Sequence, residues 1–337
     1  MLALLCTLLF THSAQAKDLS VFWWNIGGAN WWSPDPQQTW KPPYSKDPLE
    51  KNILNIAKGP QSPDVMIFCE YWSGFIGDQT LDALVNIYPY NYSLPYNTNG
   101  RPFAILVLSK TKFDYRYQRN ALHWADAKTE EIENKKHPTY TRSYQRLTFN
   151  IDGHELNIVP LHAVEPWADM VEEDASKPGA IKSTVNKLFP KHQSNAEHFV
   201  GKAETFLNMM FTKKNPSAYQ AQIFQNKLAD DKATGGHAES AFWLFVGDFN
   251  LPSHYKGFTP KAFKIFSKGF KEAPGSSYHP YSFPSVTAGY YSSYPPMTLD
   301  HALIQGTGFS AHTVMGLENG LDSGSDHYPL TITLHSQ

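Results

Sequence analysis

The sequence predicts an α/β sandwich, in which two mixed β-sheets pack face to face and helices cover their outer faces. Short apolar, β-branched or aromatic runs typical of strands lie at Leu19–Ile26, Val65–Cys69, Phe103–Leu108, Arg146–Ile151, Leu156–Leu161, Phe242–Val246, Ala302–Ile304 and Leu330–Leu334. Residues with helical spacing lie between some of these runs, at Pro48–Lys58, Gln79–Val85 and Ser194–Leu228. Strands and helices are mixed rather than strictly alternating, which favours two packed sheets over one parallel sheet.

Length and composition favour one folded domain. The 337 residues are enough to bury a substantial core. Hydrophobic residues make up 41% of the chain and charged residues 18%, a balance that excludes a disordered or fibrous protein. The net charge of −2 excludes an overall basic field, so a nucleic-acid substrate would need a local basic surface.

The N-terminal segment predicts export of the protein. An apolar stretch at Leu2–Phe10 precedes Ala14-Gln15-Ala16, whose small residues have the spacing of a signal-peptidase site. We expect a signal peptide at residues 1–16, a single catalytic domain at residues 17–337 and a secreted or periplasmic location. Cleavage would remove Cys6 and leave Cys69 alone, which excludes an intramolecular disulfide and a cysteine zinc site.

Polar residues capable of chemistry recur at the ends of the predicted strands. They are Asn25, Glu70, His162, Asp248, Asn250, Asp300, Asp326 and His327. Asp248 and Asn250, two positions apart, would point the same way on an extended segment. Each residue alone has a plainer explanation: a turn cap for Asp248 and Asn250, a surface acid for Glu70, a core or surface histidine for His162 and His327. Because chance would not place all of them at strand ends, we interpret them as one site.

These residue types suit the hydrolysis of a phosphate ester. The reaction needs charge neutralisation at the phosphate oxygens, an activated water and a stabilised leaving group. Glu70 offers a hard oxygen ligand for Mg²⁺, and Asn25 is placed to orient that carboxylate or a metal-bound water. His327 is the best general base, because an imidazole titrates near neutral pH and a carboxylate on its far nitrogen would raise its basicity.

Two motifs carry a family resemblance. Gly247-Asp248-Phe249-Asn250 and Ser325-Asp326-His327-Tyr328-Pro329, with Glu70 upstream and a matching strand at Phe103–Lys110, resemble the endonuclease/exonuclease/phosphatase superfamily. That superfamily includes deoxyribonuclease I, abasic-site endonucleases, sphingomyelinases and inositol-polyphosphate phosphatases. The resemblance spans Val21–Leu334 and implies a four-layer α/β sandwich of the deoxyribonuclease I type.

The resemblance also implies roles for individual residues. Asp300 would orient His327, and Asp248 would orient the attacking water or help to hold the metal. Asn250 would hydrogen-bond the phosphate, and His162 would contact the phosphate or assist the leaving group.

Metal and phosphate contacts follow from the same resemblance. Asn25, Glu70 and Asp326 would form the side that binds Mg²⁺, with Mn²⁺ as a possible substitute. Arg142 and Arg101 would contact phosphate oxygens. In deoxyribonuclease I, a glutamate that supports the first histidine precedes the arginine that corresponds to Arg101. This chain has Gly100 at that position, so it departs from the family pattern in the residue that would support His162.

The substrate class stays open at this point. A nuclease that cleaves DNA or RNA is the first hypothesis; a sphingomyelinase or phospholipid phosphodiesterase, a phosphoinositide phosphatase and a catalytically silent binding module are alternatives. Two aromatic loops, Asn30–Lys46 and Ser276–Met297, are expected at the rim of the cleft, where they would select the substrate. We expect a monomer without an obligate protein partner. His301 is interpreted as structural, and His192, His198 and His237 as surface residues.

Overall fold

The fold is described from a computed structural model, which covers residues 18–28, 45, 47–95, 103–122, 142–163, 216–238, 240–254, 259–283, 297–318 and 323–337. The expected signal peptide, Gly100, Arg101, His192 and His198 lie outside these residues. So do most of the first aromatic loop, residues 284–296 of the second and the part of the expected long helix before residue 216.

The described strands form two sheets. The first has seven strands, in the spatial order β10 (Gly275–Ser277), β12 (Phe309–Met315), β13 (Leu330–Ser336), β1 (Leu19–Asn25), β2 (Val65–Tyr71), β4 (Ala104–Ser109) and β3 (Tyr90–Pro95). The second has six, in the order β5 (Asp114–Leu122), β6 (Arg142–Ile151), β7 (His154–His162), β8 (Phe242–Asp248), β11 (Asp300–Gln305) and β9 (Lys271–Glu272). Both sheets contain parallel and antiparallel pairs, so both are mixed.

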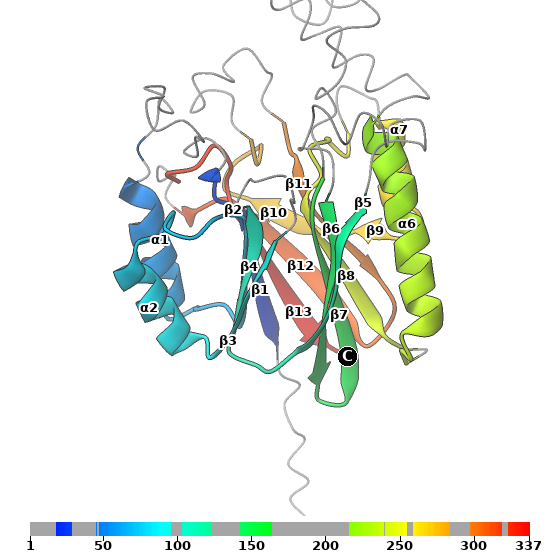
Figure 1. Cartoon of the computed structure of the whole chain (residues 1–337), viewed down its shortest axis with the longest axis horizontal. Helices are drawn as coiled ribbons and strands as arrows, with labels where there is room; N and C mark the ends of the chain where they lie inside the picture. Colours follow the sequence, from blue (N-terminus) through cyan, green and yellow to red (C-terminus); the bar gives the residue numbers. More distant parts are fainter. Residues whose placement is uncertain are drawn as a thin grey trace, which may run out of the picture.

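Helices cover the two outer faces. Helices α1 (Asp47–Lys58) and α2 (Asp78–Ile87) lie against the first sheet, whereas α6 (Pro216–Thr234) and α7 (Lys261–Phe266) lie against the second (Figure 1). The layers run helix, sheet, sheet, helix, and the predicted four-layer α/β sandwich is confirmed. Among the described residues, no helix is both long and apolar enough to cross a lipid bilayer.

Side-chain alternation along β1 explains why this strand is apolar at nearly every position. Val21 and Trp23 pack between the two sheets, while Phe22 and Trp24 pack under the helices of the first sheet. Successive side chains of a strand point to opposite faces, and here both faces are buried. Strand β8 behaves in the same way, and all eight predicted strands lie in β-strands of the structure.

Strand pairing brings the predicted site residues to one edge of the sandwich. Strand β7 runs parallel to β8, so that His162 pairs with Asp248 at their carboxyl ends. Strand β11 runs antiparallel to β8, so Asp300, its first residue, also pairs with Asp248. The close approach of β7 and β8 requires a glycine at the preceding position, because a Cβ on Gly247 would lie 2.0 Å from the Leu161 carbonyl oxygen.

The first sheet meets this edge in a corresponding way. Strand β1 ends at Asn25 and runs parallel to β2, which carries Glu70 near its end. Strand β13 runs antiparallel to β1, and its first residue, Leu330, pairs with Trp23. The segment just before β13, with Asp326 and His327, therefore enters beside the end of β1.

Candidate active site

Asp248 is the centre of the site. Its Oδ2 accepts a hydrogen bond of 3.0 Å from Asn25 Nδ2, and its Oδ1 accepts one of 2.7 Å from the backbone N–H of Asn250. The same Oδ2 lies 3.7 Å from His327 Nε2 and 3.8 Å from His162 Nε2. One buried carboxylate thus lies close to four other predicted site residues, of which only Asn250 comes from the same segment of the chain.

Asn250 reaches the site through a turn rather than on an extended strand. Strand β8 ends at Asp248, and Asn250 has a φ of 51°, in the left-handed region that asparagine tolerates better than most residues. Its Nδ2 donates to the Ala163 carbonyl oxygen at 2.9 Å. The expectation that Asp248 and Asn250 share one extended segment is wrong, because the Asp248 side chain caps a turn. The turn-cap interpretation and the functional one therefore hold together.

A β-bulge aims Glu70 at the site. Four residues of β2, from Phe68 to Tyr71, lie opposite three residues of β4, from Leu106 to Ala104. Glu70 occupies the bulge and has a φ of 57°. A residue other than glycine in this left-handed region carries a backbone strain of about 1–3 kcal/mol, which persists only where the surrounding structure enforces it.

Asn25 links this strained carboxylate to the centre of the site. Its Nδ2 donates to Glu70 Oε1 at 3.2 Å as well as to Asp248 Oδ2. Its Oδ1 accepts the backbone N–H of Gly27 at 3.0 Å, which fixes the orientation of the amide. Position 28, which follows Gly27, must also be a glycine, because a Cβ on Gly28 would lie 1.9 Å from the Glu70 carbonyl oxygen.

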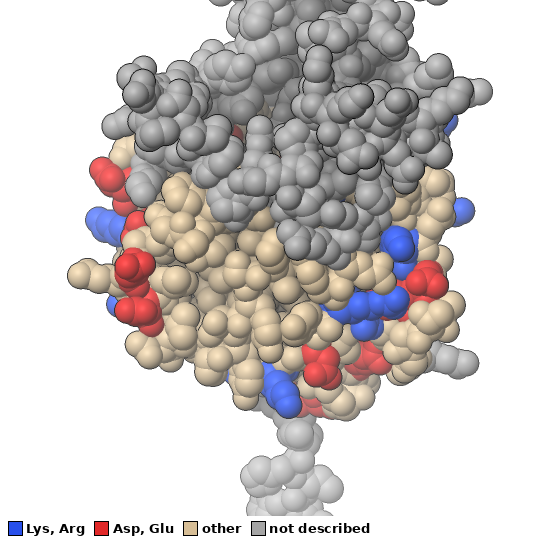
Figure 2. All heavy atoms as spheres, viewed as in Figure 1, with Lys and Arg blue, Asp and Glu red and all other residues tan. Residues whose placement is uncertain are grey.

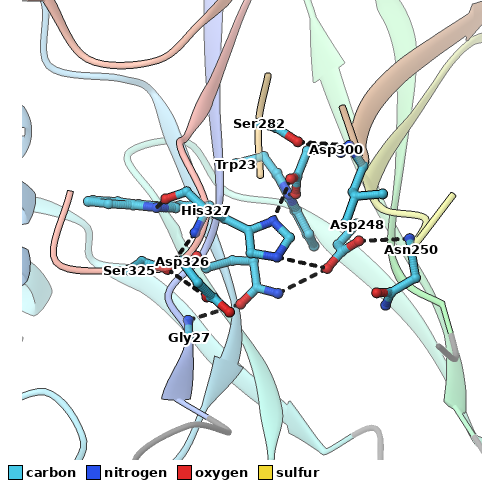
Figure 3. Close-up of polar contacts among 12 residues, drawn as sticks. Trp23, Gly27, Asp248, Asn250, Ser282, Asp300, Ser325, Asp326 and His327 are labelled. Carbon is cyan, nitrogen blue, oxygen red and sulfur yellow. Dashed lines mark hydrogen bonds and ion pairs between the residues drawn. The ribbon is translucent and has the colours of Figure 1, made fainter. Parts of the chain in front are cut away.

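His327 and Asp300 form a hydrogen-bonded pair. His327 Nδ1 lies 2.7 Å from Asp300 Oδ2, and the other oxygen of Asp300 accepts the Trp23 indole N–H at 2.8 Å (Figure 3). Ser282 Oγ accepts the backbone N–H of Asp300 at 3.0 Å. Asp326, the neighbour of His327 in sequence, instead accepts from the Ser325 hydroxyl at 3.3 Å. Asp300 therefore holds the imidazole, as the family resemblance implied.

Charge within the site shifts the titration of its residues. Burial alone would lower the pKa of His327, but the carboxylates of Asp300 and Asp248 raise it well above its ordinary value. Burial, with the charge of Asp300, raises the pKa of Asp248 to about 7, although His327 and the hydrogen bonds from Asn250 and Asn25 act in the opposite direction. His327 and Asp248 therefore titrate as a pair that holds a proton near neutral pH.

His162 and Arg142 lie on the other side of Asp248. Arg142 Nε donates to the His162 carbonyl oxygen at 3.0 Å, and His162 Nε2 lies 3.6 Å from Glu70 Oε1. Burial and the charges of Arg142 and His327 lower the pKa of His162 well below its ordinary value, so its imidazole is neutral at pH 7. Carboxylates of Glu70 and Asp248 thus stand near this ring.

The donor set fits a hard divalent cation. Mg²⁺ prefers one or two carboxylates together with water and substrate oxygens, and Glu70 and Asp326 both offer carboxylates. Asn25 Nδ2 donates to carboxylate oxygens of Glu70 and Asp248, and its Oδ1 accepts the backbone N–H of Gly27. These contacts fit the expectation that Asn25 orients the Glu70 carboxylate.

A second group of possible metal ligands consists of Asp248, Asp300 and His327. One ligand atom from each lies within 4.8 Å of the others. Both oxygens of Asp300 already accept hydrogen bonds, from Trp23 and from His327 Nδ1. This group is better suited to hold a water molecule than a cation.

Sequence reasoning missed two partners of Asp300, namely Trp23 and Ser282. The predictions for two other histidines had different outcomes. His301 points away from the pair, with Nδ1 2.8 Å from Glu272 Oε1 and Nε2 2.9 Å from the Leu251 carbonyl oxygen, in line with its structural interpretation. His237 was expected on the surface, but its side chain is only 7% exposed and packs on Trp243.

Comparisons with known proteins agree with this arrangement. The sequence profile described as "Endonuclease/Exonuclease/phosphatase family" matches residues 22–327. No curated protein sequence matches the chain significantly.

Solved structures of three different proteins have the same fold as this chain. Truncated TDP2 from Caenorhabditis elegans has 16% identity and a TM-score of 0.52, over 95% of this chain and 98% of that one. Sphingomyelinase C from Streptomyces griseocarneus has 16% identity and a TM-score of 0.55, over 94% and 99%. A variant of beta toxin from Staphylococcus aureus with bound magnesium ions has 13% identity and a TM-score of 0.55, over 95% and 100%.

At these identities the solved structures establish the fold alone. The family follows from the sequence profile, which spans nearly the whole described chain, including the whole motif around Asp248 and the second motif as far as His327. This chain belongs to the endonuclease/exonuclease/phosphatase family.

Proposed function

We propose that this chain is a metal-dependent phosphodiester hydrolase. One observation carries the proposal: the Asp300–His327 pair presents Nε2 of its imidazole 3.7 Å from Asp248 Oδ2, beside the Glu70 carboxylate. That separation is too long for a direct hydrogen bond, and it leaves both atoms able to contact one water.

In the proposed reaction the water is activated by the protein's own side chains. Asp300 fixes the orientation of His327, and Asp248 Oδ2, on a carboxyl group whose pKa is raised to about 7, accepts the proton of the water. A Mg²⁺ or Mn²⁺ ion bound by Glu70 and Asp326 would supply positive charge against the phosphate oxygens.

Four residues would meet the phosphate and the leaving group. The Asn250 amide, which donates to the Ala163 carbonyl oxygen here, would hydrogen-bond the phosphate, and Arg142, together with Arg101, would bind phosphate oxygens. His162, whose imidazole is neutral, would donate a hydrogen bond to the leaving oxygen. Arg142 supports that role by holding the His162 backbone.

Nucleic acid is the first proposed substrate class, and the head group of a phospholipid or sphingolipid is the second. Figure 2 shows basic and acidic side chains interspersed on the face in view, with uncharged residues between them. On this face, a nucleic-acid substrate would find no broad basic patch among the described residues in view. We further propose that the protein is exported, by the signal peptide at residues 1–16, and acts as a monomer.

The test is a comparison of substrates with and without metal. Purified mature protein would be incubated with plasmid DNA, RNA, sphingomyelin vesicles and phosphoinositide vesicles, in Mg²⁺, in Mn²⁺ and in EDTA. We expect hydrolysis of one class in Mg²⁺, its loss in EDTA and its recovery when metal is restored. Full activity in EDTA, or no phosphodiester cleaved in either metal, would contradict the proposal.

A further inference from the structure

Two consecutive tryptophans, Trp23 and Trp24, precede Asn25 at the end of β1. Their side chains point to opposite faces of the strand: Trp23 packs between the two sheets, and Trp24 packs toward α1 and α2. Both are fully buried. A buried indole nitrogen needs a hydrogen-bond acceptor, because an unsatisfied donor costs about 1–3 kcal/mol.

Both indole nitrogens find their acceptors in the same pair of residues. Trp23 Nε1 donates to Asp300 Oδ1 at 2.8 Å, and Trp24 Nε1 donates to the backbone carbonyl oxygen of His327 at 3.0 Å. The two donors lie on opposite faces of one strand, yet they contact the two members of the Asp300–His327 pair. Figure 3 shows Trp23 and Asp300 side by side above the imidazole.

The contact made by Trp23 also joins the two sheets at the catalytic edge. Trp23 belongs to β1 of the first sheet and Asp300 to β11 of the second, and they are 277 residues apart in sequence. With Oδ1 bound to Trp23 and Oδ2 bound to His327 Nδ1, the Asp300 carboxylate has a donor on each oxygen. It therefore cannot turn about its Cβ–Cγ bond without losing both bonds.

Core packing alone does not account for these two residues. An apolar ring would fill either position, as Phe22 and Phe68 do in the same layer as Trp24. What a tryptophan adds is an N–H group, and in both cases that group is directed at the Asp300–His327 pair. We propose that Trp23 and Trp24 are positioning residues, which hold the carboxylate of Asp300 and the backbone of His327 from opposite faces of β1.

The catalytic consequence rests on the proposed function. Neither indole is exposed to a substrate, so removing the N–H should lower kcat and leave KM unchanged. Loss of a partner that orients an active-site ligand typically costs about 10- to 100-fold in activity. The effect should be larger for Trp23, which binds the carboxylate itself, than for Trp24, which binds the histidine backbone.

The experiment compares Trp23→Phe, Trp24→Phe and the double variant with Trp243→Phe. Trp243 is also a buried tryptophan of a central strand, but its ring contacts Lys232 and His237, so it controls for the loss of ring size. We expect kcat to fall about 10- to 100-fold in Trp23→Phe, less in Trp24→Phe, and to stay within about twofold in the control. An unchanged kcat in Trp23→Phe, or an equal fall in Trp243→Phe, would overturn the proposal.

A second measurement does not depend on activity. In ¹⁵N-histidine-labelled protein, the hydrogen-bonded Nδ1 proton of His327 should give a downfield resonance in the wild type and in Trp243→Phe, and this resonance should broaden or vanish in Trp23→Phe. If the wild type cleaves no phosphodiester, the proposed function fails, while this resonance still decides whether Trp23 holds the pair. An unchanged resonance in Trp23→Phe would overturn the positioning role.

A variant that retains shape covers the case in which Trp23→Phe does not fold. Replacing Trp23 with 3-benzothienylalanine keeps a ring system of nearly the same size and exchanges only the N–H group for sulfur. We expect this protein to fold and to lose kcat and the His327 resonance as Trp23→Phe would. If it retained both, Trp23 would serve only to fill the core.

Discussion

Two groups of charged residues in this molecule differ in how their charges are paired. The active-site group comprises Glu70, His162, Asp248, Asp300, Asp326 and His327. The distal group joins α6 and the segment after it to β5, β6 and β7, and comprises Arg116, Tyr144, Arg146, Glu155, Asp231 and His237. Both groups mix acids with bases, and Arg116 and Glu155 of the distal group are partly exposed, but only the distal group has its charges matched.

In the distal group, each charge meets an opposite charge directly. Asp231 is fully buried, contacts Arg116, forms an ion pair with Arg146 at 3.3 Å and accepts the Tyr144 hydroxyl at 2.9 Å. Glu155 pairs with His237. Two carboxylates thus face two arginines and a histidine, the condition under which buried ions are tolerated.

In the active-site group, carboxylates exceed the cations that face them. Asp248 lies 3.7–3.8 Å from its two histidines, beyond hydrogen-bond range, and burial with the charge of Asp300 raises its pKa to about 7. The repulsion among these carboxylates destabilises the folded state, and a bound cation would reduce it. Unmatched buried charge is thus found at the proposed site of chemistry, whereas the matched charges of the distal group join a helix to a sheet.

The largest expected effect follows from replacing an aspartate of the active-site group with asparagine. Asp248→Asn should lower kcat by about 10²–10⁴-fold, because the amide cannot accept the proton of the attacking water. Its free energy of unfolding should change little, because the lost hydrogen bond is offset by relief of the repulsion from Asp300. Steady-state kinetics on the substrate found in the metal test, together with urea unfolding, would measure both quantities.

The outcome that contradicts this expectation is a variant that retains turnover. Asp248 would then be a structural turn cap for Asn250 and nothing more. A large loss of both stability and turnover would instead place Asp248 with the matched group, and the comparison between the two groups would fail.

The same substitution in the distal group should have the opposite pattern. Asp231→Asn leaves Arg116 and Arg146 without their buried partner, and breaking such a pair costs about 3–5 kcal/mol. Because Arg116 is partly exposed, we expect the free energy of unfolding to fall by about 3 kcal/mol. At a temperature where the variant is folded, kcat should be unchanged.

A neighbouring residue provides the matched control for this variant. Asp230 also contacts Arg116, at 3.6 Å, but its side chain is 57% exposed. Asp230→Asn should cost under about 1 kcal/mol, as exposed ion pairs do. Equal losses in Asp230→Asn and Asp231→Asn would show that the buried position of Asp231 has no special weight.

Strands buried on both faces, such as Phe242–Val246, are continuous apolar runs and are readily predicted. Strand β13 alternates between buried and partly buried positions, but Leu330–Leu334 contains only aliphatic residues and threonine, so it is also predicted. The missed strands lack that signal for identifiable reasons. Strand β3 lies at a sheet edge and is largely exposed, β5 is an edge strand rich in polar residues, and β9 and β10 are very short. Strand β12 alternates, with Phe309 and Ala311 buried and His312 exposed.

The site was predictable in its membership but not in its contacts. Residues at strand ends identify which side chains meet, because pairing brings those ends together. Which carboxylate holds His327 was not readable from spacing, since Asp326 is adjacent in sequence but Asp300 makes the contact. Trp23 gave no local sign of its role, because its partner lies in the other sheet and in the last part of the chain.

The smallest expected effect concerns the pH dependence of the distal group. Burial would raise the pKa of Glu155, but hydrogen bonds from Asn157, from the Ala238 N–H and from His237 lower it below its ordinary value. An acid with a depressed pKa in the folded state contributes stability that is full above its unfolded pKa of about 4.3 and is lost as the pH falls through the folded value. The wild type should therefore exceed Glu155→Gln in free energy of unfolding at pH 5–7, by under about 1 kcal/mol for the charge-dependent part, and this excess should shrink toward pH 3. Urea unfolding of both proteins across that range would measure it, with Asp230→Asn as the exposed control. A difference that stayed constant with pH would mean that Glu155 acts through neutral hydrogen bonds, and the charge matching ascribed to the distal group would then rest on Asp231 alone.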